Sequence, residues 1–165
     1  MAIKDALLPE FDQEMATTRR VLERLREDKY DWAPHEKSMK AGRLASHIAE
    51  MSTWGTLSLK QDALDLAGGH EAFNAASKTE LLAAFDRNIE ECRKAIEAAD
   101  DAAFMQTWSL KQGDTVIMAL PKISVLRTLV LNHIIHHRGQ LSVYLRLTGS
   151  PVPSIYGPSA DEGQS

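Results

Sequence analysis

The sequence predicts an all-α protein, a four-helix bundle with a crossover connection, and three observations support this class. The chain has 165 residues and 44% hydrophobic content, enough for one hydrophobic core and too little for two ordinary domains. Four long segments place apolar residues at alternating spacings of three and four, which is typical of helices packed on neighbouring helices. No internal repeat or linker divides them. We therefore expect one domain over residues 1–165, irregular from about residue 150.

The first segment predicts a helix over about residues 3–28, because Leu8, Phe11, Met15, Leu22 and Leu25 repeat at helical spacing. A polar connection follows over residues 27–40. It is interrupted by Pro34, and Tyr30 and Trp32 are expected to hold it against the end of the bundle. Ser38 is a plausible N-cap for the second helix.

The second segment predicts a helix that continues towards Leu64 and Leu66 and stops at Gly68 and Gly69. Its buried stripe is expected to contain Leu44, His47, Met51, Trp54 and Ser58. His47 is thus predicted to lie on a buried line of the helix.

The third and fourth helices are predicted on similar grounds. Ser77 or Thr79 can cap a third helix, whose expected stripe is Leu82, Phe85, Ile89, Cys92 and Ile96. Residues 105–120 contain a "QGD" turn signal between β-favouring residues, which favours a short β-hairpin or an extended crossover. The last helix opens after Pro121 and ends before Gly149, with an expected stripe of Leu126, Val130, His133, His137, Gln140, Tyr144 and Leu147. In the tail that follows, Tyr156 is the residue that could dock on the bundle.

Composition narrows the classes of partner and compartment. The formal net charge is −4, with acidic and basic residues interspersed, so we expect neither nucleic acid nor an anionic membrane as a partner. The opening residues lack the apolar run of a signal peptide, and eighteen apolar residues never run together, which favours a cytoplasmic protein. The single cysteine, Cys92, excludes an internal disulfide and is interpreted as buried packing rather than a reactive thiol.

Histidines interrupt the apolar pattern of the last helix at residues 133, 136 and 137. His133 and His137 are about 40° apart around a helix and roughly 6 Å apart along it, which suits chelation of one ion. His136 lies at the edge of the predicted stripe and is the weaker candidate. His47 lies on the buried stripe of a different helix, so three imidazoles could meet inside the bundle.

Three neutral imidazoles satisfy one another poorly, and a divalent cation would accept a lone pair from each. Three histidine ligands leave coordination positions open, as in catalytic sites, and the carboxylates of a di-iron centre are missing. Glu50 could be a ligand or a hydrogen-bond partner of a ligand, but a solvated helix face is the favoured interpretation. A purely structural role in core hydrogen bonding remains the alternative for the histidines.

The runs "LASHIAEM" and "NHIIHHRGQLSVYLRLTGSPVPSIYGPS" resemble the DinB/YfiT-like family of metalloenzymes over nearly the whole chain. The resemblance implies a four-helix bundle with a crossed connection and a homodimer. It also implies nickel or zinc on one histidine of the second helix and two of the last, which here are His47, His133 and His137. Some relatives are transferases or isomerases that use low-molecular-weight thiols, so a thiol cofactor and a small-molecule substrate are implied loosely.

Two functions are compatible with these residues. The first is a metal-dependent enzyme of thiol-transferase or hydrolase type, and the second is a non-catalytic metal-binding module of the stress response, closed by a fourth protein ligand. Around the metal, Gln140 could orient His137. Trp54 could line a pocket, although core packing is the favoured interpretation. Tyr144 could serve as a hydrogen-bond donor, although a buried tyrosine with a satisfied hydroxyl is favoured. Arg138 is interpreted as a surface or interface ion-pair residue.

Overall fold

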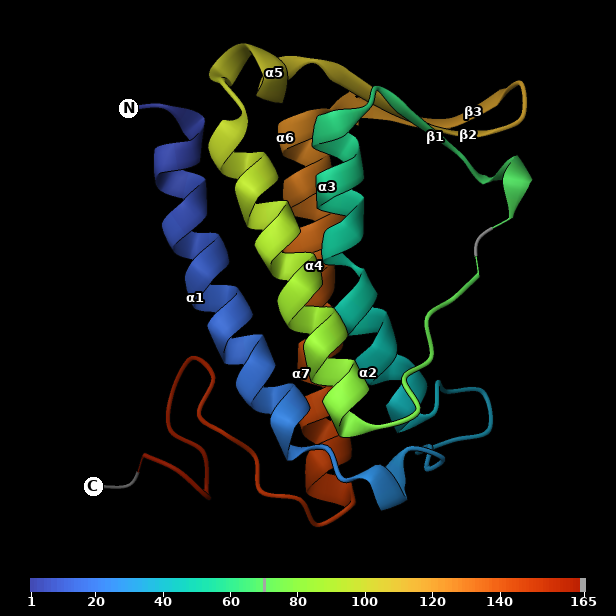
Figure 1. Cartoon of the computed structure of the whole chain (residues 1–165). Coiled ribbons are helices and arrows are strands. Elements are labelled where there is room, and N and C mark those ends of the chain that lie inside the picture. Colours follow the sequence, from blue (N-terminus) through green and yellow to red (C-terminus); the bar gives the residue numbers. More distant parts are fainter. Residues whose placement is uncertain (70, 164–165) are drawn as a thin grey trace.

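The computed structural model describes residues 1–69 and 71–163, and it is predominantly helical with one small sheet (Figure 1). The helical elements in chain order are α1 (Ile3–Arg24), η1 (Glu27–Lys29), α2 (Ala41–Glu50), α3 (Ser52–Lys60), η2 (Leu66–Gly68), α4 (Lys78–Ala98), α5 (Asp101–Met105), α6 (Lys122–Val125), the π-helical η3 (Leu126–Leu131) and α7 (Asn132–Leu147). The strands are β1 (Ala63–Asp65), β2 (Thr107–Gln112) and β3 (Thr115–Pro121).

Four helical rods lie side by side: α1, α2 with α3, α4, and α6 with η3 and α7 (Figure 1). Helix α1 packs against α4 and α7, and α2 also packs against α4 and α7. The consecutive helices α1 and α2 therefore occupy opposite corners, and the loop between them crosses the end of the rods. The core between the rods includes Phe11, Leu44, Ile48, Phe85 and Leu141.

The first two helices are shorter than the sequence predicts. Helix α1 ends at Arg24 rather than near residue 28, because Leu25 already has an extended backbone. The second helix is predicted to reach Leu66, but α3 ends at Lys60. That extension is wrong: Leu64 lies in strand β1, whose backbone groups pair with β2, and Leu66 begins a 3-10 turn.

The start of α2 is capped by backbone groups, so Ser38 is not its N-cap. Lys40 occupies the N-cap position without a side-chain cap. The amide of Ala41 donates to the carbonyl of Trp32 at 2.8 Å, and the amide of Gly42 donates to the carbonyl of Tyr30 at 2.9 Å. The aromatic connection thus satisfies the first helical N–H groups, which otherwise have no partner within a helix.

Helix α4 begins as predicted, because the Ser77 hydroxyl accepts a hydrogen bond from the amide of Glu80 at 3.1 Å. Phe85, Cys92 and Ile96 are fully buried, which confirms these positions of the stripe, whereas Leu82 and Ile89 are only partly buried. Burial raises the pKa of the Cys92 thiol to about 12, so the thiolate is scarce at neutral pH.

The predicted hairpin is present as β2 and β3, which pair antiparallel around a turn at Gly113, a residue with φ of +60°. Strand β1 adds to its edge in parallel with β2, with Ala63 opposite Ser109. The all-α class is therefore wrong in this respect. The parallel pair joins segments more than forty residues apart, a contact that local periodicity does not indicate.

The last rod begins after Pro121 as predicted, but its buried stripe differs in the second half. Ile134, Leu141 and Leu145 are fully buried, whereas Leu147 is 60% exposed. The expected continuation through Leu147 is wrong. The residues that face the core on this helix each follow directly after a residue of the predicted stripe, which contains the histidines. The described residues after Ser150 form bends without helix or strand.

Arg138 is buried, which corrects its interpretation as a surface residue. Its side chain is 1% exposed and forms an ion pair with Glu14 of α1, with Nη1 at 2.7 Å from Oε2. Nη2 donates to the hydroxyl of Tyr156 at 2.7 Å, and that hydroxyl contacts the Glu14 carboxylate at 3.0 Å. Arg138 thus joins α7, α1 and the C-terminal tail.

Candidate metal centre

Three histidines meet where α2 packs against α7. His47 lies on α2, and His133 and His137 lie one turn apart on α7. One ring nitrogen from each lies within 4.8 Å of those of the other two. The ring centroid of His47 is 5.2 Å from that of His133 and 4.8 Å from that of His137, and the centroids of the α7 pair are 4.6 Å apart. The cluster is accessible from one side, because His47 and His133 are only partly buried.

Each of the three rings has a hydrogen-bond partner outside the cluster. Nδ1 of His47 lies 3.0 Å from Oε1 of Glu50, and Nδ1 of His137 lies 2.7 Å from Oε1 of Gln140. His133 bonds to the backbone of Leu129, which lies in the π-helical segment η3 directly before α7. Single π-helical turns inside helices are frequent at functional sites, where they displace backbone groups from the regular pattern.

The partners of His47 and His137 determine which nitrogen has the proton. A carboxylate and an amide oxygen only accept hydrogen bonds, so Nδ1 must donate in both rings. Each neutral ring then has a lone pair on Nε2. The Nε2 atoms of His133 and His137 lie 2.8 Å apart. Without a metal, the Nε2–H tautomer of His133 can donate to the lone pair of His137. In its other tautomer His133 offers a third lone pair, so the donor set fits a metal ion.

The surroundings of His133 and His137 favour the neutral form of both rings. Burial lowers the pKa of His137 to about 4, with an opposing contribution from Gln140. Burial also lowers the pKa of His133, and the nearby His47 lowers it further. Neutral imidazole is the form that binds metal ions.

Glu50 is a buried partner of the cluster, so its interpretation as part of a solvated face is wrong. Burial by itself raises its pKa, but hydrogen bonds from His47, the amide of Phe73 and Arg43 lower it to about 2. The guanidinium of Arg43 donates to Oε1 at 2.8 Å, and the Phe73 amide donates to Oε2 at 2.9 Å. The segment that contains Phe73 covers this side of α2 and excludes water from the carboxylate.

A cavity of about 330 Å³ lies beside the cluster, between the helices and the sheet. Its polar end is formed by Arg43, His47, Glu50 and His133. Its apolar walls are formed by Met51, Trp54, Leu110, Ile117, Met118 and Leu129. A larger hollow of about 420 Å³ between α3, α4 and α5 has no histidine and is separate from this chemistry.

The other sequence candidates have different positions. His136 is exposed and outside the cluster, although its ring centroid lies 5.0 Å from that of His137. Trp54 is a cavity wall and also packs against the core. Tyr144 lies away from the cavity, with its ring 5.3 Å from that of Trp32 and its hydroxyl bonded to the carbonyl of Met39.

Sequence reasoning missed several residues of the site. The sequence did not indicate a role for Arg43, because an arginine at this position is ordinary for a helix. Leu110, Ile117 and Met118 lie in the predicted hairpin, but nothing local places that hairpin over α2 and α3. The π-helical segment η3, which contains Leu129, also has no marker in the sequence.

Fold and site together define a predominantly helical protein with a cluster of three histidines between helices that could hold a metal ion. The profile of the DinB family matches residues 1–164, and the chain belongs to this family. A search of curated proteins gave no match.

Two solved structures share the fold. A DinB-like protein from Bacillus cereus aligns with a TM-score of 0.73 at 22% identity, covering 94% of this chain and 98% of its own. A DinB-like protein from Bacillus subtilis aligns with a TM-score of 0.71 at 20% identity, covering 91% and 97%. Among the described residues, no helix combines the length and the apolar character needed to cross a bilayer.

Proposed function

We propose that this chain is a metal-dependent enzyme that binds nickel or zinc through His47, His133 and His137. The proposed reaction is of thiol-dependent transferase or hydrolase type and acts on a small molecule. We place it in a single domain over residues 1–165 and, following the family resemblance, in a homodimer. A low-molecular-weight thiol is the proposed co-substrate of the transferase form.

The observation that supports metal binding most directly is the hydrogen bonding of the rings. His47 and His137 donate through Nδ1 to Glu50 and Gln140, so both present Nε2 to the cluster. Bonds of this kind orient imidazole ligands and increase their basicity. This shared orientation of two rings from different helices supports metal binding over a role in core hydrogen bonding alone.

The surroundings of the cluster favour an enzyme over a closed structural site. In the described part of the chain, the group that could hold a metal contains three histidines and no fourth cysteine, histidine or carboxylate. Three protein ligands with free positions are typical of catalytic zinc sites. The cavity beside His47 and His133 gives a small molecule access to that free side.

When bound, a divalent cation supplies Lewis acidity that lowers the pKa of a coordinated water or thiol. The chain's own residues prepare this chemistry. Glu50 holds His47 in one orientation, and Gln140 does the same for His137. Arg43 neutralises the charge of Glu50, so the carboxylate does not compete as a base at neutral pH.

Metal content of protein purified without a histidine tag tests the proposal. We expect about one divalent ion per chain in the wild type, and a loss of affinity of well over tenfold in His47→Ala and His137→Ala, because each removes a ligand. His136→Ala is the matched control, since His136 is exposed, adjacent in sequence and outside the cluster. The control should retain wild-type metal content.

A screen of thiols paired with electrophilic small molecules, on metal-loaded protein, then tests the reaction. Turnover that disappears in His137→Ala and persists in His136→Ala supports the enzyme. Stoichiometric metal in both ligand variants would refute the site. Full metal binding without turnover on any thiol pair or hydrolysable ester would instead favour the non-catalytic metal-binding module.

A further inference from the structure

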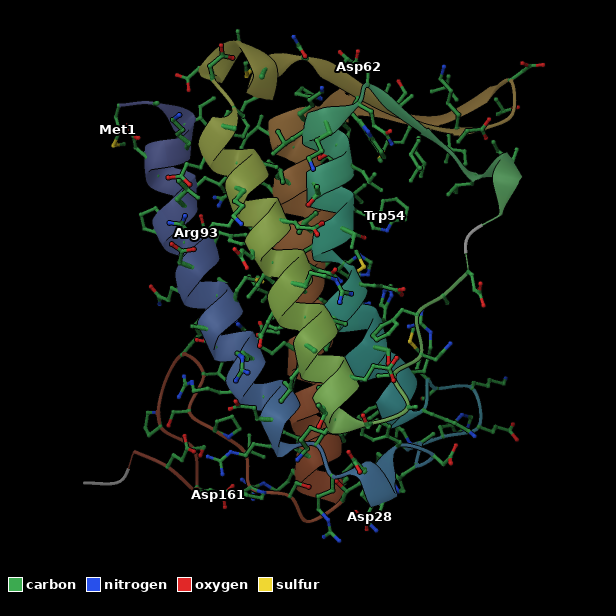
Figure 2. The ribbon with its side chains drawn as sticks, viewed as in Figure 1. Met1, Asp28, Trp54, Asp62, Arg93 and Asp161 are labelled. Atoms are coloured by element: carbon green, nitrogen blue, oxygen red, sulfur yellow. The ribbon has the colours of Figure 1, made fainter. Side chains whose placement is uncertain are left out.

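The cavity beside the histidines has two chemically different ends. Its polar groups come from α2 and from the cluster, whereas its other walls are apolar side chains of α3, η3, the hairpin and the junction between α2 and α3. Figure 2 shows Trp54 projecting from α3 on the side of the strands. The volume of about 330 Å³ is within the usual range of ligand pockets, about 300–1,000 Å³.

A β-bulge in the hairpin brings two consecutive side chains into this cavity. Leu110 pairs with Met118, but the next residue, Lys111, pairs with Val116, so Ile117 is an extra residue on β3. In a regular strand, neighbouring side chains point to opposite faces. Here Ile117 and Met118 both line the cavity. Bulges next to active sites commonly redirect a side chain in this way.

The exposure of Ile117 also points to a ligand. Its side chain is 54% exposed although it lines an apolar cavity, so the cavity mouth leaves apolar surface in contact with water. Covering such surface with an apolar group is favourable. At the opposite end, the ion pair between Arg43 and Glu50 leaves no net charge from these two residues, so the charge offered to a ligand there is that of a bound cation.

We infer that the substrate is a small molecule with a metal-coordinating head group and an apolar body, and that Trp54, Leu110, Ile117 and Met118 select that body. This inference rests on the proposed function, because the head group binds the cation held by the three histidines. The β2–β3 hairpin is then a specificity element, with its bulge aligning Ile117 and Met118 along the body of the ligand.

Hydroxamates of different chain length test this selection on zinc-loaded protein by calorimetry. Acetohydroxamate offers only the head group, and hexanohydroxamate adds four methylenes. Each buried methylene is worth about fourfold in affinity, so we expect hexanohydroxamate to bind at least about tenfold more tightly. Equal affinities for the two probes would overturn the inference while the metal site stands.

Ile117→Ser and Val116→Ser form a matched pair on the same hairpin. Both residues are about half exposed, at 54% and 52%, but only Ile117 lines the cavity. Ile117→Ser should reduce the preference for hexanohydroxamate about threefold or more and leave acetohydroxamate affinity and zinc content unchanged. Val116→Ser should leave all three unchanged. Equal effects of the two substitutions would contradict the assignment.

Metal-free protein separates failure of this inference from failure of the proposed function. Cyclohexanol, which has no strong metal-binding group, should shift the methyl resonances of Ile117 and Met118 in NMR spectra but not those of Val116. If zinc does not bind at all, the proposed function fails, and these shifts still decide whether the cavity accepts apolar molecules. Absence of the shifts would overturn the inference in that case as well.

Discussion

Each histidine of the cluster has a neighbour that orients its ring. These neighbours differ in the number of other contacts they make. Glu50 also binds Arg43 and the Phe73 amide, so its replacement would disturb the packing of α2 as well as the site. Gln140 is exposed, and its carbonyl oxygen accepts from Nδ1 of His137 at 2.7 Å. Gln140 is therefore the cleaner position at which to test orientation.

Gln140→Ala should weaken metal affinity about tenfold, because His137 loses the acceptor that holds its tautomer. The free energy of unfolding should hardly change, since the side chain is exposed. Competition with a chromophoric chelator measures the metal affinity. Urea denaturation of metal-free protein measures the free energy of unfolding. Gln140→Glu keeps an acceptor oxygen and should retain tight binding. Equal weakening in both variants would contradict the orienting role.

The sequence predicted that the three histidines lie close together but not that Glu50 is buried, and the range of the contacts involved explains the difference. His133 and His137 share a face through helical spacing alone, and His47 follows from the pattern of its own helix. Glu50 occupies a position that would be solvated on an isolated pair of helices. It is covered instead by the segment around Phe73, more than twenty residues away, whose amide donates to it at 2.9 Å.

At the scale of elements, α3, α4 and η3 approach closely at Gly55. A Cβ atom at this position would lie 2.6 Å from Sγ of Cys92 and 3.1 Å from Cδ2 of Leu126. Glycine in the middle of a helix is normally unfavourable. Its presence in α3 is explained by this contact, because a side chain here would separate the three elements.

Gly55→Ala should reduce the free energy of unfolding by about 1–3 kcal/mol, because the added methyl overpacks the contact. Gly139→Ala is the control: among the described residues, no heavy atom beyond the adjacent residues and the nearby backbone of α7 lies within 4 Å of the place its methyl group would take. This substitution should stabilise α7 by about 0.5–1 kcal/mol. Urea denaturation measures both. Cys92→Ala should relieve part of the Gly55→Ala defect by removing Sγ. A Gly55→Ala protein as stable as the wild type would contradict the proposed close packing.

At the scale of the whole molecule, the C-terminal tail is tied to the helices by charged groups. Arg138 and Glu14 join α7 to α1 beneath it, and Tyr156 bonds to both. Asp161 pairs with Arg146 of α7 at 2.6 Å. The histidines on α7 are therefore held by the tail as well as by the core, since Arg138 directly follows His137.

Arg138→Leu should reduce the free energy of unfolding by about 3–5 kcal/mol, because it leaves the Glu14 carboxylate buried without its cation. The double variant Glu14→Leu with Arg138→Leu should be more stable than Arg138→Leu alone, since no buried charge is left unpaired. Chemical denaturation of the single and double variants measures the coupling. Strictly additive losses would show that the pair does not act as a unit.

The sequence by itself predicted four helical segments, a cap at Ser77 or Thr79, a turn within residues 105–120 and the proximity of the three histidines. All of these follow from spacing or from contacts within a few residues, which a linear pattern records. Only the tertiary structure decided the parallel pairing of β1 with β2, the burial of Arg138 and Glu50, and the position of Ile117 in the cavity. Each of these features depends on a partner from a distant segment. Burying a charge or adding a strand is favourable only when that partner supplies the opposite charge or the hydrogen bonds.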